Sequence, residues 1–249
     1  MFKSVELTVS GKTIRGTIMT PAGDGPFPTI CFYHGFSVDR VGIDRLHFLF
    51  SKRCVEEGFA CVRFDFYGCG ESDGDFREKR ISFELEQTLA IYDWTIQQSF
   101  ADSERMFMVG HSLGGILSSM AAPLRQPRAI ALWSPGLTAY YDISNRIHAV
   151  PSRYKEVYSV GGLLLSSEFL TELRAIDIIE KSTGFRNKVL IVHGELDEKV
   201  PVYVTGPYMD LYGEQAALKI VDGANHQYSD WSWKQQVYDA SIDFLKAQL

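Results

Sequence analysis

One serine of this chain lies in a pattern that could make it a nucleophile. An apolar segment, 106–109, runs into Gly110-His111-Ser112-Leu113-Gly114-Gly115, and a helical pattern continues to residue 122. A serine flanked by glycines, between a strand and a helix, is typical of a nucleophile elbow. The turn brings backbone against backbone, which side chains at the flanking glycines would block. The alternative is an ordinary glycine-rich turn, so the chain must also supply a base, a carboxylate and an oxyanion hole.

A histidine and an aspartate in the C-terminal part of the chain are the predicted partners of Ser112. A serine hydroxyl needs a base, and histidine is the side chain that takes a proton near neutral pH. His226 follows the last expected strand, where parallel sheets bind ligands, although a loop histidine is more often a solvated surface residue. Asp197, in the loop after the preceding strand, would hold the imidazole in the useful tautomer. Its neighbours Glu195 and Glu198 are rivals for that role.

An oxyanion hole is expected from two backbone N–H groups, because acyl transfer develops negative charge on the carbonyl oxygen. One belongs to Leu113, which follows the serine. The other belongs to Phe36, in the His34-Gly35-Phe36 loop after an apolar strand. His34 and His111 border these loops, and we expect both to contact the substrate.

Strands and helices alternate along the chain after an N-terminal hairpin, which is expected over 2–9 and 13–19. The later strands are continuously apolar, which indicates a parallel sheet covered on both faces. We therefore predict an α/β fold with a mostly parallel central sheet and helices on both faces. The expected strands are 29–33, 59–66, 106–109, 129–133, 189–192 and 216–221, and the expected helices, besides the one after the elbow, are 43–57, 82–98, 202–212 and 234–247.

A long segment between two of these strands lacks the strand–helix rhythm. We interpret 136–186 as an inserted cap or lid over the active face, and 1–135 with 187–249 as the core. Within the cap, Gly161-Gly162 precede a helical stretch expected over 163–181.

Composition limits the other classes of function. The 249 residues carry a formal net charge of −6 without a cluster of Lys and Arg, which argues against binding to nucleic acid or to an anionic membrane. No apolar run reaches transmembrane length and no signal-peptide pattern opens the chain, so we expect no membrane insertion and a cytoplasmic location. The four cysteines fit a reducing compartment. No metal-ligand spacing is present, so we expect neither metal nor cofactor.

Taken together, these motifs resemble those of the α/β-hydrolase superfamily along essentially the whole chain. The order Ser112, Asp197, His226 is the order that this superfamily uses. Further matching motifs are His34-Gly35-Phe36, Asp65-x-x-Gly68-x-Gly70-x-Ser72, Val189-Leu190-Ile191-Val192-His193-Gly194 with Val200-Pro201, and Gly223-Ala224-Asn225-His226. Length, cap position, Gly161-Gly162 and the Gln227-Tyr228-Ser229-Asp230 segment make the chain most similar to bacterial cinnamoyl (feruloyl) esterase-like serine hydrolases.

That resemblance implies hydrolysis of hydroxycinnamic acid esters through an acyl-serine, with the cap holding the aromatic acyl group. Leu163-Leu164-Leu165 stands where an aromatic residue and a tyrosine would bind the phenolic hydroxyl, and we expect Leu164 to lie at the substrate. An apolar side chain cannot make that hydrogen bond. The residues that could supply it instead are Tyr140, Tyr141, Asp142 and Tyr154.

We therefore expect a serine carboxylic-ester hydrolase for small to medium esters, hydroxycinnamoyl and other aryl esters among them. The same triad serves acyl thioesterases and lipases, which remain alternatives. Arg146 and Arg153 in the cap leave a CoA thioester open. A non-catalytic ligand-binding protein on this fold is the rival of another class. The expected partner is a small-molecule ester, and a homodimer is left open.

Overall fold

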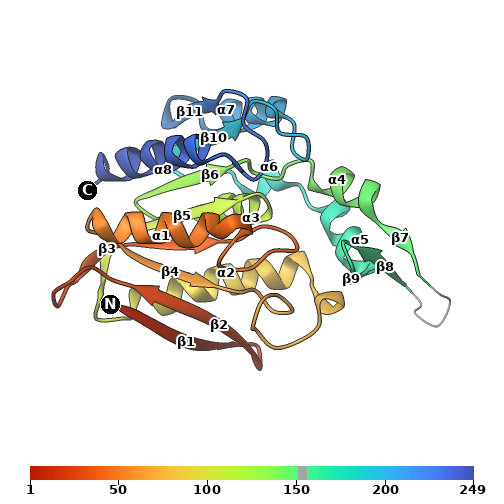
Figure 1. The fold of residues 1–249 in the computed structure, drawn as a ribbon, viewed down its shortest axis with the longest axis horizontal. Coiled ribbons are helices and arrows are strands. Elements are labelled where there is room, and N and C mark those ends of the chain that lie inside the picture. The colour runs from red at the N-terminus through yellow and green to blue at the C-terminus, as the bar shows by residue number, and fades with distance from the viewer. Residues whose placement is uncertain (151–155) are drawn as a thin grey trace.

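The computed structural model describes residues 1–150 and 156–249, which form a central sheet flanked by helices (Figure 1). The strands of this sheet are β1 (Phe2–Val9), β2 (Lys12–Met19), β3 (Phe27–Tyr33), β4 (Ala60–Phe64), β5 (Ala101–His111), β6 (Ala129–Trp133), β10 (Lys188–Gly194) and β11 (Ala216–Val221). The surrounding helices are α1 (Leu46–Glu56), α2 (Ile81–Ile96), α3 (Leu113–Arg125), α7 (Thr205–Tyr212) and α8 (Trp231–Lys246). Short 3₁₀ turns occupy Ile43–Arg45, Phe76–Glu78, Val202–Val204 and Gly213–Gln215.

The eight strands lie in the order β1-β2-β4-β3-β5-β6-β10-β11. The pairs β1–β2 and β2–β4 are antiparallel, and the other neighbours in the sheet are parallel. The α/β fold predicted from the sequence is therefore confirmed. Strand β5 lies between β3 and β6, with Gly110 opposite Tyr33 and His111 opposite Trp133. The carboxyl ends of these strands meet at one edge of the sheet, where Ser112 follows β5.

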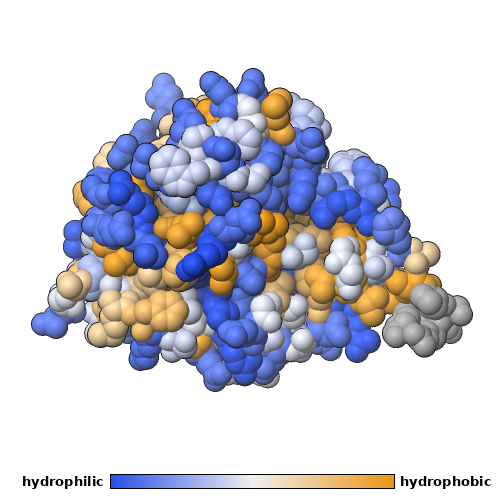
Figure 2. Space-filling model, viewed as in Figure 1, coloured by the Kyte–Doolittle hydropathy of each residue, from blue (hydrophilic) through white to orange (hydrophobic). Residues whose placement is uncertain are grey.

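Each face of the sheet is covered by its own apolar cluster. Helices α1 and α8 pack on one face through residues such as Phe50 and Val237. Helices α2, α3 and α7 pack on the other through residues such as Ile91, Ile116 and Tyr208. Polar side chains cover much of the molecular surface in the view of Figure 2, with apolar ones gathered in its middle and toward the cap. Within the described ranges, no helix has the length and apolar character needed to cross a membrane.

The segment between β6 and β10 projects from one end of the sheet (Figure 1). Its elements are α4 (Ala139–Arg146), β7 (His148–Ala149), β8 (Val157–Val160), β9 (Leu163–Ser166), α5 (Ser167–Ala175) and α6 (Ile178–Lys181). Strands β7, β8 and β9 form a small antiparallel sheet of their own. This is the region that the sequence assigned to a cap.

The helix predicted over 163–181 is wrong in its first turn and at 176–177, where extended backbone separates α5 from α6. Gly161 and Gly162 have φ values of +55° and +82° and form the two-residue turn of a hairpin between β8 and β9. Two residues at positive φ match the twist of antiparallel strands, which is why glycine pairs favour hairpins. The helix α5 begins only after Ser166, whose side chain accepts the N–H of Phe169 at 3.3 Å.

Candidate active site

Ser112 occupies a strained turn between β5 and α3. Its backbone angles are φ 58° and ψ −116°, a region that non-glycine residues rarely adopt. Its N–H donates to the carbonyl of Trp133 at 2.8 Å, which ties the turn to β6. A Cβ on Gly110 would lie 2.1 Å from the carbonyl oxygen of Gly114, and one on Gly114 would lie 2.1 Å from that of Tyr33. The packing therefore leaves no room for a side chain at either flanking glycine. The strand–turn–helix context predicted for the serine is present.

The imidazole of His226 connects Ser112 to Asp197. Its Nδ1 donates to Asp197 Oδ2 at 2.7 Å, and its Nε2 accepts from Ser112 Oγ at 2.9 Å. Asp197 Oδ1 accepts the N–H groups of Lys199 and Val200 at 3.0 and 2.8 Å. Burial opposes ionisation of Asp197, but the hydrogen bond and charge of His226, with the Val200 N–H, outweigh it and lower the pKa. The carboxylate is thus ionised and holds the tautomer in which Nε2 can take the serine proton.

Two backbone N–H groups beside Ser112 have no protein acceptor within the described part of the chain. They belong to Leu113, the first residue of α3, and to Phe36. Gly35 brings the second loop close, because a Cβ there would lie only 3.1 Å from Ser112 Cβ. The ring of Phe36 packs against Phe76 with a centroid distance of 5.2 Å, which anchors the loop. The two donors expected for an oxyanion hole are therefore free and adjacent to the serine.

His34, expected to contact the substrate, lies buried behind the Gly35 loop. Its Nε2 accepts the N–H of Phe66 at 3.0 Å, and its Nδ1 donates to the carbonyl of Gly35 at 2.8 Å. Burial is the main cause that lowers its pKa to about 3. Both ring nitrogens are occupied by backbone, and the residue does not line the pocket at Ser112. The expectation is corrected: His34 positions the loop that carries the Phe36 N–H.

His111 does line this pocket, but its ring nitrogens face the protein. Its Nε2 lies 2.9 Å from the carbonyl oxygen of His226, and its Nδ1 lies 3.1 Å from Nε2 of His47. Burial is the main cause that lowers the pKa of His111 to about 3. The Nε2 contact holds the main chain of His226.

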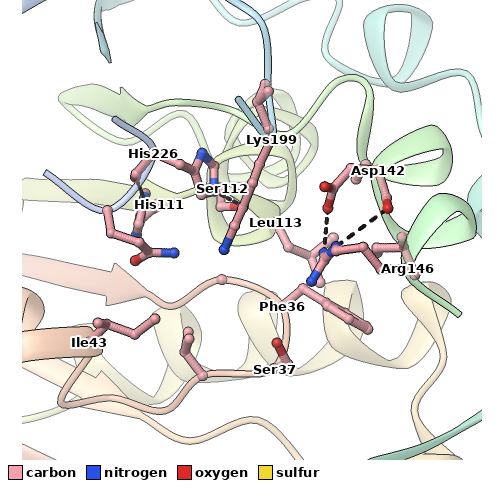
Figure 3. Close-up of a pocket in the computed structure, with 16 residues that line it drawn as sticks. Phe36, Ser37, Ile43, His111, Ser112, Leu113, Asp142, Arg146, Lys199 and His226 are labelled. Carbon is pink, nitrogen blue, oxygen red and sulfur yellow. Dashed lines mark hydrogen bonds and ion pairs between the residues drawn. The ribbon is translucent and has the colours of Figure 1, made fainter. Parts of the chain in front are cut away.

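A pocket of about 80 Å³ opens beside Ser112 (Figure 3). Its walls come from the elbow, from helix α4 of the cap and from the loops that follow β3, β10 and β11. Leu113 and Ile143 supply apolar surface. The pocket therefore gathers residues from distant parts of the chain around the serine hydroxyl.

Three charged residues also line the pocket. Arg146 and Asp142 form an ion pair, drawn as a dashed line in Figure 3. Lys199, whose backbone N–H binds Asp197, extends its side chain into the pocket. Sequence reasoning missed Lys199, although its place two residues after the predicted acid was the available signal. No three His, Cys, Asp or Glu side chains gather as a metal site within residues 1–150 and 156–249.

The cap residues expected at the substrate lie elsewhere. Tyr140 and Tyr141 line a separate hollow formed with α5 and α6, and Tyr141 is 68% exposed. Leu164 lies on β9 and does not line the pocket at the serine. These three expectations are corrected: α4 presents Ile143 and Arg146 to the pocket in place of the tyrosines, and no residue of β9 lines it. Tyr154 and Arg153 lie outside the described residues.

Comparison with known proteins places this chain in a family. Residues 10–243 match the family described as X-Pro dipeptidyl-peptidase (S15 family). The chain belongs to this family. Its fold is that of the α/β-hydrolase superfamily, as the motifs indicated, and solved structures similar to it include alpha/beta hydrolase domain-containing protein 10 from mouse, with a TM-score of 0.76, 21% identity and coverage of 99% of this chain and 100% of that one.

Other relatives and structures extend this picture. The chain is 33% identical over 99 residues to an uncharacterised 31.7 kDa protein of Escherichia coli, covering 40% of this chain and 34% of that protein. It is 27% identical over 194 residues to human palmitoyl-protein thioesterase ABHD10, mitochondrial, covering 71% of this chain and 59% of that protein. The chain thus spans about a third and three fifths of these two relatives. Ferulic-acid-bound Est1E from Butyrivibrio proteoclasticus has a TM-score of 0.86 at 23% identity, covering 98% of each chain, which shows the shared fold.

Proposed function

We propose that this protein is a serine ester hydrolase that acts through an acyl-serine intermediate. The observation that carries the proposal is the unbroken hydrogen-bonded chain from Asp197 through His226 to Ser112, beside the free N–H groups of Leu113 and Phe36. Ser112 Oγ attacks the ester carbonyl while His226 takes its proton, and the two N–H groups bind the oxyanion. His226 then protonates the leaving alcohol, and water repeats the attack to release the acid. Asp197 stays ionised throughout.

The size of the pocket favours the smaller substrates of this class. A cavity of roughly 15 Å³ holds one water molecule, so the 80 Å³ beside Ser112 suits a short acyl or alcohol group. We propose small to medium esters. The structural likeness to an esterase with ferulic acid bound supports including hydroxycinnamoyl esters at the upper end of that range.

An acyl thioester is the second candidate substrate. The curated relatives named palmitoyl-protein thioesterase support it, and one triad can cleave either bond. A dipeptide-releasing peptidase, named in the family description, is less well supported by the charges of the pocket. The free ammonium group of a peptide calls for an unpaired carboxylate, whereas Asp142 is paired with Arg146 and Lys199 adds positive charge.

The test is turnover on a matched panel with Ser112→Ala as the blank and Ser144→Ala, on the cap helix away from the pocket, as the control. The panel holds p-nitrophenyl acetate, butyrate and decanoate, methyl ferulate and an acyl-CoA. We expect short p-nitrophenyl esters to be cleaved by wild type and control but not by the blank. A preference for acyl-CoA would show that the substrate is a thioester and not an oxygen ester. A wild type that cleaves nothing and does not react with a fluorophosphonate would refute the proposal.

We propose the cytoplasm as the compartment of this activity. The cysteines Cys31, Cys54, Cys61 and Cys69 are free and buried, whereas disulfides form in oxidising compartments. The net charge of −6 supports a small-molecule partner over nucleic acid. Fractionation of cells that express the tagged protein tests the location.

A further inference from the structure

The charges of the pocket are not balanced. Among the described residues that line it, Arg146 and Lys199 are cations and Asp142 is the carboxylate. Asp142 is committed to Arg146, which it meets through its side chain and, at 3.4 Å, through its backbone carbonyl. The guanidinium also lies 6.0 Å from the ring centroid of Phe36. This pair forms part of the wall and leaves Lys199 without a counter-charge.

Lys199 is placed in the pocket by the loop that carries the predicted acid. Its backbone N–H donates to Asp197 Oδ1 at 3.0 Å, which fixes the start of the side chain. Figure 3 shows that side chain extending across the pocket, in front of Ser112 in this view, with the ammonium group pointing inward. Within residues 1–150 and 156–249, no carboxylate lies within 4.0 Å of this ammonium group and no side-chain or backbone acceptor binds it. The residue is nevertheless partly buried.

The described residues leave the positive charge of this ammonium group without a counter-ion in the pocket beside Ser112. A bound anionic group would supply the opposite charge, since charge complementarity selects the ligand of a site. The chain as a whole carries a net charge of −6. The positive charge is therefore local to the pocket and does not reflect a generally basic surface.

We propose that the ester substrate carries a carboxylate close to the bond that is cleaved, and that Lys199 binds this carboxylate. The inference rests on the proposed function, since it names the substrate class of the same site. A lysine ammonium group binds a carboxylate as a compact point charge, and the 80 Å³ pocket requires the anionic group to lie only a few bonds from the carbonyl. Half-esters of short dicarboxylic acids and acyl esters of short hydroxy acids both have this chemistry.

The experiment compares charged and neutral esters of the same shape by pH-stat titration. The acyl-side arm uses monomethyl glutarate and its neutral amide, methyl glutaramate. The alcohol-side arm uses acetoxyacetate and acetoxyacetamide. For each arm, the ratio of kcat/KM for the charged and the neutral ester is measured in wild type and in each variant. Dividing the wild-type ratio by the variant ratio cancels both the intrinsic reactivity of the esters and the fraction of active protein.

Four variants make the test specific. Lys199→Met removes the charge while its backbone N–H keeps the bond to Asp197, Lys199→Glu reverses the charge, and Lys199→Arg restores it. Lys52→Met, exposed on α1 and away from the pocket, is the control. A charge-assisted hydrogen bond predicts a roughly tenfold to hundredfold loss of the charged-ester preference in Lys199→Met on at least one arm. Lys199→Glu loses more, Lys199→Arg keeps most of the preference, and the control ratio stays near one.

The arm that responds shows whether the carboxylate belongs to the acyl or the alcohol part. A change below about twofold on both arms in Lys199→Met, with p-nitrophenyl acetate still cleaved through Ser112, overturns the inference and leaves the esterase intact. Absence of any Ser112-dependent hydrolysis of p-nitrophenyl acetate is a different result, because it overturns the proposed function and the inference together.

Discussion

Replacing Asp197 with asparagine should disable the proposed base while keeping its position. Asp197 Oδ1 accepts the N–H groups of Lys199 and Val200 at 3.0 and 2.8 Å, so the asparagine must place its carbonyl oxygen there. Its NH₂ group then faces Nδ1 of His226, which has to become an acceptor. The imidazole proton moves to Nε2, where it points at Ser112 and prevents transfer of the serine proton.

The size of the effect follows from the wrong tautomer. The corresponding change in a serine protease lowers kcat roughly 10⁴-fold, which is about 5.4 kcal/mol of transition-state stabilisation at about 1.36 kcal/mol per factor of ten. Asp197 does not line the pocket. We therefore expect the loss in kcat, with KM changed by less than about twofold, because ground-state binding is untouched.

Hydrolysis of p-nitrophenyl acetate measures both constants, and the midpoint of urea unfolding shows whether each variant is folded. The matched controls are Glu195→Gln and Glu198→Gln, exposed neighbours on the same loop that rivalled Asp197 in the sequence. Glu195 accepts the N–H of Gly223 at 2.8 Å and does not reach His226. Retention of more than about a tenth of wild-type kcat by the asparagine variant, or an equal loss in either control, would refute the role of Asp197.

Two further predictions concern stability. Gly114→Ala should lower the free energy of unfolding by about 1–3 kcal/mol, because the added carbon would lie 2.1 Å from the carbonyl oxygen of Tyr33. Gly206→Ala, in open space on α7, should raise it by about 0.5–1 kcal/mol, and urea unfolding compares the two. Stability should also fall as pH drops from 6.5 toward 3. Burial lowers the pKa of His34 and His111 to about 3, so the unfolded state binds protons in this window that the native state excludes. Each histidine adds about 1.4 kcal/mol per pH unit to that loss, and equal unfolding midpoints at pH 7 and pH 4 would contradict it.

Features encoded by neighbouring residues could be predicted from the sequence. The fold class and most strand and helix positions follow from local apolar runs, and the elbow follows from glycines beside Ser112. The segment after Gly161-Gly162 in the cap shows where prediction from local apolar runs fails. Apolar residues 163–165 fit a helix and a strand equally well, and the Gly161-Gly162 turn decides for a strand.

Features that depend on where side chains point could not be predicted from spacing. His34 and His111 both border the active loops in sequence, but His34 turns inward to Phe66 while His111 lines the pocket. Tyr140 lies on α4, as Ile143 does, but of these two residues the helix presents Ile143 to the pocket at Ser112 and Tyr140 to the neighbouring hollow. Without the register of α4 on the core, the sequence indicates that a cap is present but not which face of it meets the substrate.

The tautomers of the two buried histidines beside the triad, His47 and His111, can be assigned by counting protons. Three contacts run in series: His226 carbonyl to His111 Nε2 at 2.9 Å, His111 Nδ1 to His47 Nε2 at 3.1 Å, and His47 Nδ1 to the Asp39 carbonyl at 3.3 Å. Each carbonyl end needs an N–H and the middle contact needs one more, so three protons would be required. Burial lowers the pKa of both His47 and His111, and two neutral rings carry only two protons.

One of the three contacts must therefore lack a proton, and the longest, at Asp39, is the weakest candidate for a hydrogen bond. His111 then donates Nε2–H to the carbonyl of His226 and accepts at Nδ1 from His47. The main chain of His226 is held by this pair, so its ring is free to bridge Asp197 and Ser112. The histidine in the elbow thus acts on the base through the backbone, which gives the buried imidazole after Gly110 a role in positioning the triad.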